Sequence, residues 1–433
     1  MGAGDIIKGI GVATTKGDPF RIFWTTTDVD PFDPKGDRSA DLQAALNAAI
    51  DGVAKNGQVR KDPRDPTNAT EFAKAFPVPI TIADISEGVG KVHVAHYNGD
   101  EVDFVASEAK VAVMYAAFQL RDMVKRFATE LGITKKAELF TKLDRLNQFI
   151  LANDKAPMMK AAKDIEGNRV KINDAMRLPQ YKKIFKVTEG LGPLTIDFDG
   201  DLVAASRDPR TRAKSPFGQL MFEMIVNSDD PLTTRCIDMI GFSFLNGALV
   251  AGGYFVVDAD PKKSKGLWVS GDYDMRELRA VMTVNDGAGK LVGTTRRFAQ
   301  MMAAIQLDLL AGVDPAGDMK TKLLGNATFS EWLGAMGNIK SSNYIGNKIG
   351  VEELGRRRGT QPRTYSEVSA LKSHSGKKYV LAWQNLQTGN PKMVDGNATW
   401  DDWQLYSGQD IANIVRETVK KYEGLAAGVD PFP

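Results

Sequence analysis

One serine and one lysine, Ser107 and Lys110, have a spacing that could support acyl transfer. They stand where an extended segment ends and an almost wholly apolar run, residues 111–118, begins. Residues three apart lie on one face of a helix, so the hydroxyl and the amine would be neighbours. A helix that is apolar on every side is buried, and burial disfavours the charged form of lysine. The pattern therefore predicts a nucleophilic serine beside an uncharged amine that can take its proton.

The residues before Ser107 favour this interpretation. Residues 78–84 and 91–97 have the composition of two strands, and Asn98-Gly99-Asp100 is typical of a turn. The same serine–lysine spacing recurs at residues 369–372 and 375–378, within two expected strands joined by a short turn. We interpret those two pairs as solvated strand residues.

Two strands followed by a Ser-x-x-Lys that opens a buried helix resemble the serine β-lactamase and penicillin-binding protein family. The family's Ser-Asp-Asn element is similar to Ser228-Asp229-Asp230 here, and its Lys-Thr-Gly element to Lys348-Ile349-Gly350. Residues 293–302 resemble the family's helix that opens with a threonine. The resemblance covers about residues 78–425.

The resemblance implies a role for each residue. Ser107 is the expected nucleophile and Lys110 the general base, while Ser228 carries a proton between Lys110 and Lys348. Lys348 also keeps the local potential positive, which favours the neutral form of Lys110. Backbone N–H groups of Ser107 and Val351 are the expected oxyanion donors.

Two departures from the family pattern concern the expected substrate-binding residues Asp230, Ile349 and Gly350. Asp230 replaces an asparagine, so an amide donor becomes an acceptor, and Ile349 replaces a threonine that helps to hold a substrate carboxylate. The segment after Asp230 also lacks the Glu-x-x-Leu-Asn sequence that deacylates in one β-lactamase class. We therefore do not expect efficient β-lactam hydrolysis.

Each candidate also has a purely structural interpretation. Asp230, followed by Pro231, has the pattern of an N-cap for a helix over residues 231–240. Lys348 would otherwise be an exposed strand lysine, and Ser228 a plain turn serine. The Ser107–Lys110 pair would be a helix start with a lysine that extends to solvent.

Composition limits the other chemistries. The chain has 433 residues, 43% hydrophobic and 25% charged, which suffices for a large core. The single cysteine, Cys236, lies among apolar residues and is expected to be a buried structural thiol. His93 and His96 would point to opposite faces of a strand, so neither a metal centre nor a Ser-His-Asp triad is expected. We expect no cofactor and no metal.

The charge and the hydropathy pattern exclude several partners. A net charge of +2 predicts no attraction to nucleic acid, and no apolar run has the length and uniformity of a membrane span. The basic clusters at residues 207–214 and 356–358 are interpreted as solvated loops. The first residues lack the pattern of a secretory signal, so we expect a cytoplasmic protein or the mature form of a secreted one.

These observations predict an α+β fold of the β-lactamase and transpeptidase type, in which helices flank an antiparallel sheet. The sheet should take its first strands from residues 78–97 and its last three from 343–384. Expected helices cover residues 39–54, 135–152, 156–165 and 407–425. The expected organisation is an N-terminal extension (1–77), a hydrolase domain (78–425) with an enlarged helical subdomain (127–215), and a C-terminal tail (426–433).

Two functional hypotheses remain open. The first is a serine hydrolase that forms an acyl-enzyme on Ser107 and acts on a small or peptide-like amide or ester. Acidic residues near the expected cleft, Asp230, Glu352 and Glu353, suggest a substrate that offers hydrogen-bond donors or positive charge. Esterase, amidase and peptidase activities all fit. The second is a penicillin-binding-like ligand-binding or sensing module with little or no turnover. The sequence predicts no oligomeric state.

Overall fold

The protein is described here from a computed structural model in which two compact units are distinguished. The helical unit comprises Ala109–Gly293 and Leu310–Ala327, and the sheet unit comprises Asp30–Glu108, Thr294–Leu309 and Thr328–Pro433. The structure describes residues 32, 37–56, 79–154, 178–212, 214–256, 265–269, 291–310, 312–327, 339–353, 363–388, 392–394, 397–399 and 402–433.

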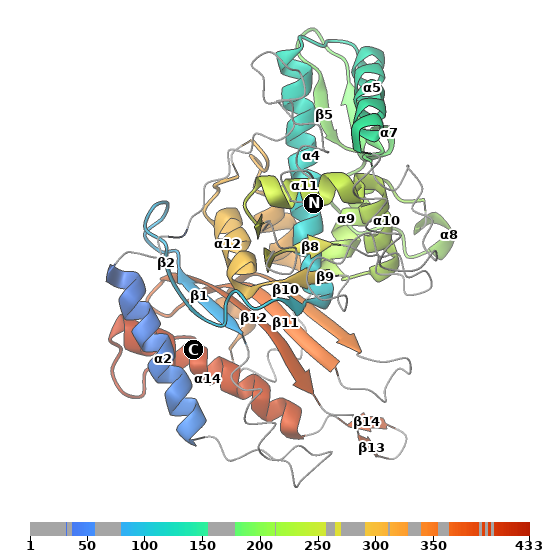
Figure 1. Cartoon of the computed structure of the whole chain (residues 1–433). Coiled ribbons are helices and arrows are strands. Elements are labelled where there is room, and N and C mark those ends of the chain that lie inside the picture. Colours follow the sequence, from blue (N-terminus) through green and yellow to red (C-terminus); the bar gives the residue numbers. More distant parts are fainter. Residues whose placement is uncertain are drawn as a thin grey trace. The chain divides into compact units, whose positions relative to one another are not determined.

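An antiparallel five-stranded sheet forms the centre of the sheet unit, with the strand order β10-β11-β12-β1-β2 (Figure 1). Its strands are β1 (Ile80–Asp84), β2 (His93–Tyr97), β10 (Tyr344–Glu353), β11 (Arg363–Lys372) and β12 (Lys378–Thr388). β1 is buried along its whole length, as expected of a strand paired on both sides. Pairing β1 with β12 joins segments almost 300 residues apart, so the sheet cannot close until the chain is nearly complete.

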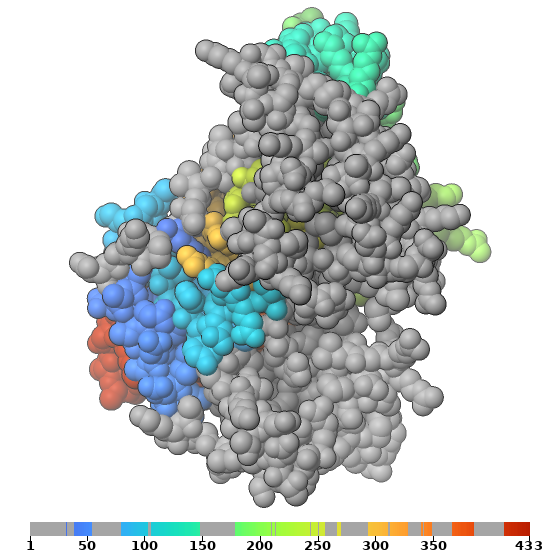
Figure 2. Space-filling model, in the orientation of Figure 1, coloured from blue at the N-terminus to red at the C-terminus, as the bar shows by residue number. Residues whose placement is uncertain are grey.

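Helices cover both faces of this sheet (Figure 1). Helix α12 (Thr295–Gln306) lies against β1, β11 and β12 on one face. On the other face α2 (Asp37–Asn56) and α14 (Asp402–Glu423) pack against each other and share an apolar core with the sheet. α2, drawn in blue, lies at the surface next to the red C-terminal residues (Figure 2).

Capping explains where α12 begins. The Thr294 side chain accepts a hydrogen bond from the Arg297 backbone N–H, so the helix opens with a threonine as predicted. The Arg296 backbone N–H donates to the Gly99 carbonyl at 3.0 Å. A Cβ at Gly99 would lie 2.8 Å from the His96 side chain and 2.9 Å from the Thr81 hydroxyl, so only glycine allows the turn to lie this close to strands β1 and β2.

The sheet unit also contains short elements. These are β3 (Asp103–Phe104), the 3₁₀ turns η2 (Ala106–Ala109) and η7 (Ser341–Asn343), and the hairpin of β13 (Lys392–Val394) and β14 (Asn397–Thr399). η2 runs directly into the first helix of the helical unit, α4 (Lys110–Glu130).

The helical unit is built around α4, most of whose residues are buried. The Arg121 guanidinium is buried in this core, 4.7 Å from the ring centroids of Phe118 and Phe198. It donates a hydrogen bond to the Val313 carbonyl at 3.2 Å. The other helices are α5 (Lys136–Asp154), α7 (Tyr181–Ile184), α8 (Pro209–Arg212), α9 (Phe217–Val226), α10 (Asp230–Ile240), α11 (Phe242–Ala251), the π-helical η5 (Asp318–Leu323) and η6 (Leu324–Asn326).

Short antiparallel strands complete the helical unit. β4 (Phe185–Thr188) pairs with β5 (Thr195–Phe198), β6 (Phe255–Val256) with β7 (Lys265–Gly266), and β8 (Trp268–Val269) with β9 (Leu291–Gly293). Among the described residues no helix has the length and apolarity needed to cross a membrane.

The predicted fold class is confirmed: the protein is α+β, with an antiparallel sheet flanked by helices and a largely helical part. The helices predicted over 39–54, 135–152 and 407–425 are found as α2, α5 and α14. The helix predicted over 156–165 lies outside the described residues. Ser369 was wrongly predicted to be solvated, because it lies on β11, an interior strand paired on both sides, and is completely buried.

Candidate functional site

Ser107 lies in the 3₁₀ turn η2 and is half-buried. The preceding residue, Ala106, has a left-handed backbone with φ 47°. This region costs a residue with a Cβ roughly 1–2 kcal/mol and persists only where the surroundings enforce it. Ser107 therefore follows a constrained turn immediately before α4, rather than standing inside a regular helix.

A buried hydrogen bond holds this turn against the sheet. The Ser366 hydroxyl on β11 donates to the Val105 carbonyl at 2.8 Å. Ser366 is paired with Gly350 of β10 in the strand register. The segment that ends at Ser107 is thus attached to the β10–β11 pair that carries the Lys348-Ile349-Gly350 element.

Lys348 is buried, with 4% of its surface exposed, so it is not an exposed strand lysine. It stands opposite Val368 in the register, and Val351 stands opposite Tyr365. The backbones of Ile349, Gly350 and Val351 are part of β10, while their side chains lie outside the described part of the chain. Their predicted contacts with substrate and oxyanion stay predictions.

Lys110 opens α4 and is completely buried. Its Nζ donates to the Ser228 carbonyl at 2.9 Å, to the Ser228 hydroxyl oxygen at 3.0 Å and to Asp230 Oδ1 at 2.5 Å. The structure thus brings together three of the predicted residues from the first two motifs, which are about 120 positions apart in the chain. The predicted proton bridge from Ser228 onward to Lys348 stays a prediction.

This geometry differs from the neutral amine expected from the sequence. An ammonium has three N–H donors and no acceptor, and three acceptors surround Nζ. A carboxylate in contact with the nitrogen stabilises the charged form. Burial alone favoured a neutral lysine, but the ion pair with Asp230 opposes that effect.

The turn between α9 and α10 presents Ser228 in a left-handed conformation, with φ 54°. Asp229, not Asp230, caps α10: its side chain accepts from the Leu232 backbone N–H at 2.9 Å. The capping interpretation of Asp230 was therefore wrong by one residue. Asp230 is left to face Lys110, and its side chain is 48% exposed.

An ionic network that the sequence analysis missed supports this turn. Arg212 Nη2 contacts Glu223 Oε2 at 2.9 Å and Asp229 Oδ2 at 2.5 Å, and the Asn227 amide donates to Glu223 Oε2 at 2.8 Å. Arg212 belongs to the basic cluster that was interpreted as a solvated loop, and for this residue that interpretation was wrong. The cluster at 356–358 lies outside the described residues.

Two buried carboxyl groups of the sheet unit were also missed. Glu108 is fully buried, and burial raises its pKa well above the usual value, an effect that Ser366 and Gln384 offset only in part. Burial likewise raises the pKa of Glu367 to about 8, although Trp383 Nε1 donates to its Oε2 at 3.2 Å. No ion pair joins either carboxyl to a basic residue of the described chain.

Only weak signals in the sequence could have revealed these groups. Glu108 lies between Ser107 and Ala109, shortly before the apolar run over residues 111–118. Glu367 stands in a strand whose residues 366–371 are all buried, so alternation along the sequence gives no signal for it. Arg212 gives no such signal because its partners come from a later helix and turn.

The remaining candidate chemistry is sparse. Cys236 is buried in α10, as predicted, and burial raises the pKa of its thiol. Within the described ranges, His, Cys, Asp and Glu side chains do not gather in any group of three or more that could hold a metal ion.

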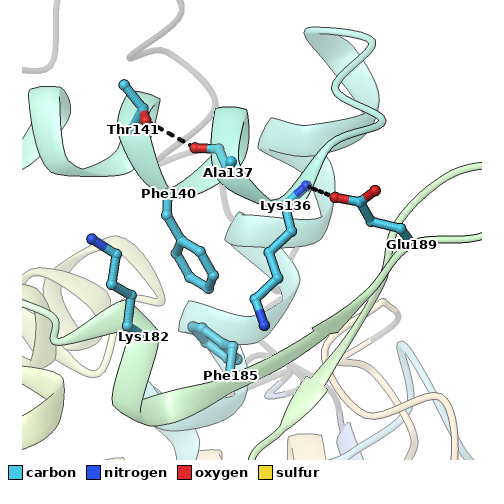
Figure 3. Close-up of a pocket in the computed structure, with 7 residues that line it drawn as sticks. All are labelled: Lys136, Ala137, Phe140, Thr141, Lys182, Phe185 and Glu189. Carbon is cyan, nitrogen blue, oxygen red and sulfur yellow. Dashed lines mark hydrogen bonds between the residues drawn. The ribbon is translucent and has the colours of Figure 1, made fainter.

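A surface pocket of about 640 Å³ lies in the helical unit, between α5, α7 and the end of β4 (Figure 3). Phe140 and Phe185 form its apolar wall, and Glu189 accepts from the Lys136 backbone N–H at 2.7 Å. The Thr141 hydroxyl, which also lines the pocket, donates to the Ala137 carbonyl of the same helix at 2.8 Å. The pocket contains none of the predicted site residues and no activated nucleophile.

Comparisons with known proteins were made for sequence and structure. No protein-family model matches the chain, and no curated protein matches its sequence. The chain is structurally similar to a β-lactamase from Chitinophaga pinensis, with 9% identity, a TM-score of 0.45, and coverage of 88% of this chain and 99% of the other.

Two further similar structures are a class A β-lactamase from Bacteroides cellulosilyticus and a β-lactamase from Xanthomonas campestris pv. campestris. The first has 11% identity and a TM-score of 0.43, and the match covers 88% of this chain and 99% of the other. The second has 12% identity and a TM-score of 0.40, and the match covers 87% of this chain and 98% of the other.

Proposed function

We propose that the protein is a serine hydrolase that forms an acyl-enzyme on Ser107 and acts on an amide or ester. The observation that carries the proposal is the 3.0 Å contact between Lys110 Nζ and Ser228 Oγ, which joins residues from two motifs predicted to work together. The constrained turn at Ala106, immediately before Ser107, is a second supporting feature.

In this mechanism Ser107 Oγ attacks the substrate carbonyl carbon, and Lys110 takes the hydroxyl proton. The bond to the leaving group then breaks, and Ser228 passes a proton to that group. Backbone N–H groups of Ser107 and Val351 stabilise the oxyanion. Water attacks the acyl-enzyme in the second half of the reaction, which releases the acid and restores Ser107.

The acidic side chain of Asp230 argues against efficient β-lactam hydrolysis by this protein. Asp230 offers oxygens where the family has an amide donor, and one of them already contacts Lys110. The site is better suited to a substrate that brings N–H donors or positive charge. Esters, amides and peptides remain open, because the fold does not select among them.

Hydrolysis of p-nitrophenyl esters tests the proposal. We expect turnover by the wild type, a loss of at least about 10³-fold in Ser107→Ala, and a similarly large loss in Lys110→Ala. The matched control is Ser375→Ala, which alters a serine with the same Ser-x-x-Lys spacing at an exposed turn and should leave the rate unchanged.

Equal rates in the wild type and Ser107→Ala would overturn the proposal. Binding of a penicillin-like ligand without any covalent product would favour the sensing module instead. Melting temperatures of all variants should be compared, because Lys110 is buried and its removal leaves Asp230 without this cation.

A further inference from the structure

The Lys110–Asp230 pair raises a question that the proposed mechanism leaves open. A general base needs a lone pair, and an ammonium that donates to three oxygens has none to offer. Before it accepts the proton of Ser107, the lysine must lose one of its own. The contact at Asp230 Oδ1 is the shortest of the three, and it opposes that loss.

The carboxylates paired around the Ser228 turn differ in how far they are exposed to solvent. Two cations, Lys110 and Arg212, face three carboxylates, Glu223, Asp229 and Asp230. The Glu223 and Asp229 side chains are 5% and 17% exposed, whereas that of Asp230 is 48% exposed. Asp230 is therefore the carboxylate of this network that an incoming cation reaches most easily.

A second cation at Asp230 would change the charge state of Lys110. The carboxylate would be shared between two positive groups that repel each other, so it would stabilise the ammonium form of the lysine less. Full burial of Lys110 would then favour release of its proton to solvent.

The neutral amine that results still has suitable partners. With the second cation on Asp230, it can donate its two N–H groups to the Ser228 carbonyl and to the Ser228 hydroxyl oxygen, which leaves its lone pair for the proton of Ser107. That arrangement frees Ser228 to act in the proton path of the proposed mechanism.

We propose that Asp230 is a charge latch: it holds Lys110 as an ammonium, and a substrate that carries a cationic amine releases the lysine by sharing the carboxylate. The inference rests on the proposed function and adds its substrate class, an ester or amide with a primary ammonium group. Asp230 acts through Lys110 and is a specificity-determining residue of the site.

The test uses p-nitrophenyl hexanoate and its ω-amino analogue, which differ only by a terminal ammonium. The wild type should prefer the amino ester by at least about tenfold in kcat/KM. Asp230→Asn should turn over the neutral ester at least about tenfold faster than the wild type. Removal of the adjacent negative charge raises the fraction of Lys110 in the neutral amine form by about this factor. The same variant should lose most of the preference for the amino ester.

Matched variants separate the latch from a structural role. Asp230→Glu keeps the carboxylate and should retain the preference for the amino ester. Asp197→Asn removes the carboxylate of an exposed lysine–aspartate pair, Lys125–Asp197, and should change neither rate. A merely structural role for Asp230 would lower the rate in Asp230→Asn and never raise it.

Labelling of Ser107 by a neutral fluorophosphonate distinguishes the two failures. Faster labelling of Asp230→Asn than of the wild type supports the latch, even where the wild type reacts too slowly to detect. Equal labelling, or slower labelling of Asp230→Asn in a protein with an unchanged melting temperature, overturns the latch and leaves the hydrolase proposal intact. Absence of label on Ser107 in both proteins overturns the hydrolase proposal and the latch with it.

Discussion

The two units treat their buried charged residues in different ways. In the helical unit the candidate site is built on ion pairs: Lys110 contacts Asp230, and Arg212 contacts both Glu223 and Asp229. In the sheet unit Glu108 and Glu367 are buried without an ion pair among the described residues, and burial raises the pKa of each. The first unit therefore places opposite charges in contact, whereas burial in the second favours the protonated form of these two carboxyls.

The difference shows that burial alone does not determine a charge state. A buried ionisable group either finds a counter-charge or changes its protonation, because an isolated charge in the interior is too costly. Pairing preserves charges for use in the candidate site, where the lysine must exchange a proton.

The largest expected effect that distinguishes the units is a pH dependence of stability arising in the sheet unit. Glu367 has a pKa of about 8 in the folded protein against the usual 4.5, so the folded state holds more protons than the unfolded state between these values. Stability should therefore fall as the pH rises from about 5 to 8, by up to about 1.4 kcal/mol per pH unit for this group.

Glu367→Gln removes the titrating carboxyl, and with it this pH dependence of stability, while its amide oxygen still accepts a hydrogen bond from Trp383. Urea unfolding across the same pH range should show a shallower slope for the variant, which should become more stable than the wild type near pH 8. Identical slopes for the two proteins would show that the buried carboxyl is charged in the folded state.

A smaller effect is expected from breaking the network of the helical unit. Arg212→Ala leaves the buried Glu223 carboxylate beside Asp229 without its cation, and we expect a loss of about 2 kcal/mol in the free energy of unfolding. The loss is below that of a fully buried pair because Arg212 is 35% exposed. Arg210→Ala, an exposed neighbour in α8, is the control and should cost less than about 0.5 kcal/mol.

The smallest of the three stability effects concerns the link between the sheet and Ser107. Ser366→Ala removes the hydroxyl that donates to the buried Val105 carbonyl, at a cost of about 1–2 kcal/mol. Labelling of Ser107 by a fluorophosphonate should slow as well, because the left-handed Ala106 loses a restraint. A variant that is destabilised yet labelled at the wild-type rate would show that this hydrogen bond does not position Ser107.

The sequence predicted the architecture well because the strands and most helices have strong local patterns. The strands around 78–97 were recognisable from composition, and the helix from Thr294 from its resemblance to the family's helix that opens with a threonine. The pairing partner of Asp230 could not be recognised from the sequence. Asp229 and Asp230 are adjacent acids before Pro231, and either could have been the cap. Only the three-dimensional turn assigns one to the Leu232 N–H and the other to Lys110.

Buried polar groups were the least predictable part. Glu108 and Glu367 are strongly polar by type, and what buries them is the pairing of β11 between two strands and the docking of η2, both long-range features. The ion pair of Lys110 likewise joins it to a residue 120 positions away, which no local pattern indicates. Local sequence determines which residues could react, and distant residues determine their protonation.

The most direct test of the account is to identify the residue that a fluorophosphonate modifies in the wild-type protein. Mass spectrometry of the intact protein followed by peptide sequencing should find a single adduct on Ser107. No adduct under conditions that saturate other serine hydrolases, or an adduct on a different residue such as Ser228, would contradict the assignment of Ser107 as the nucleophile.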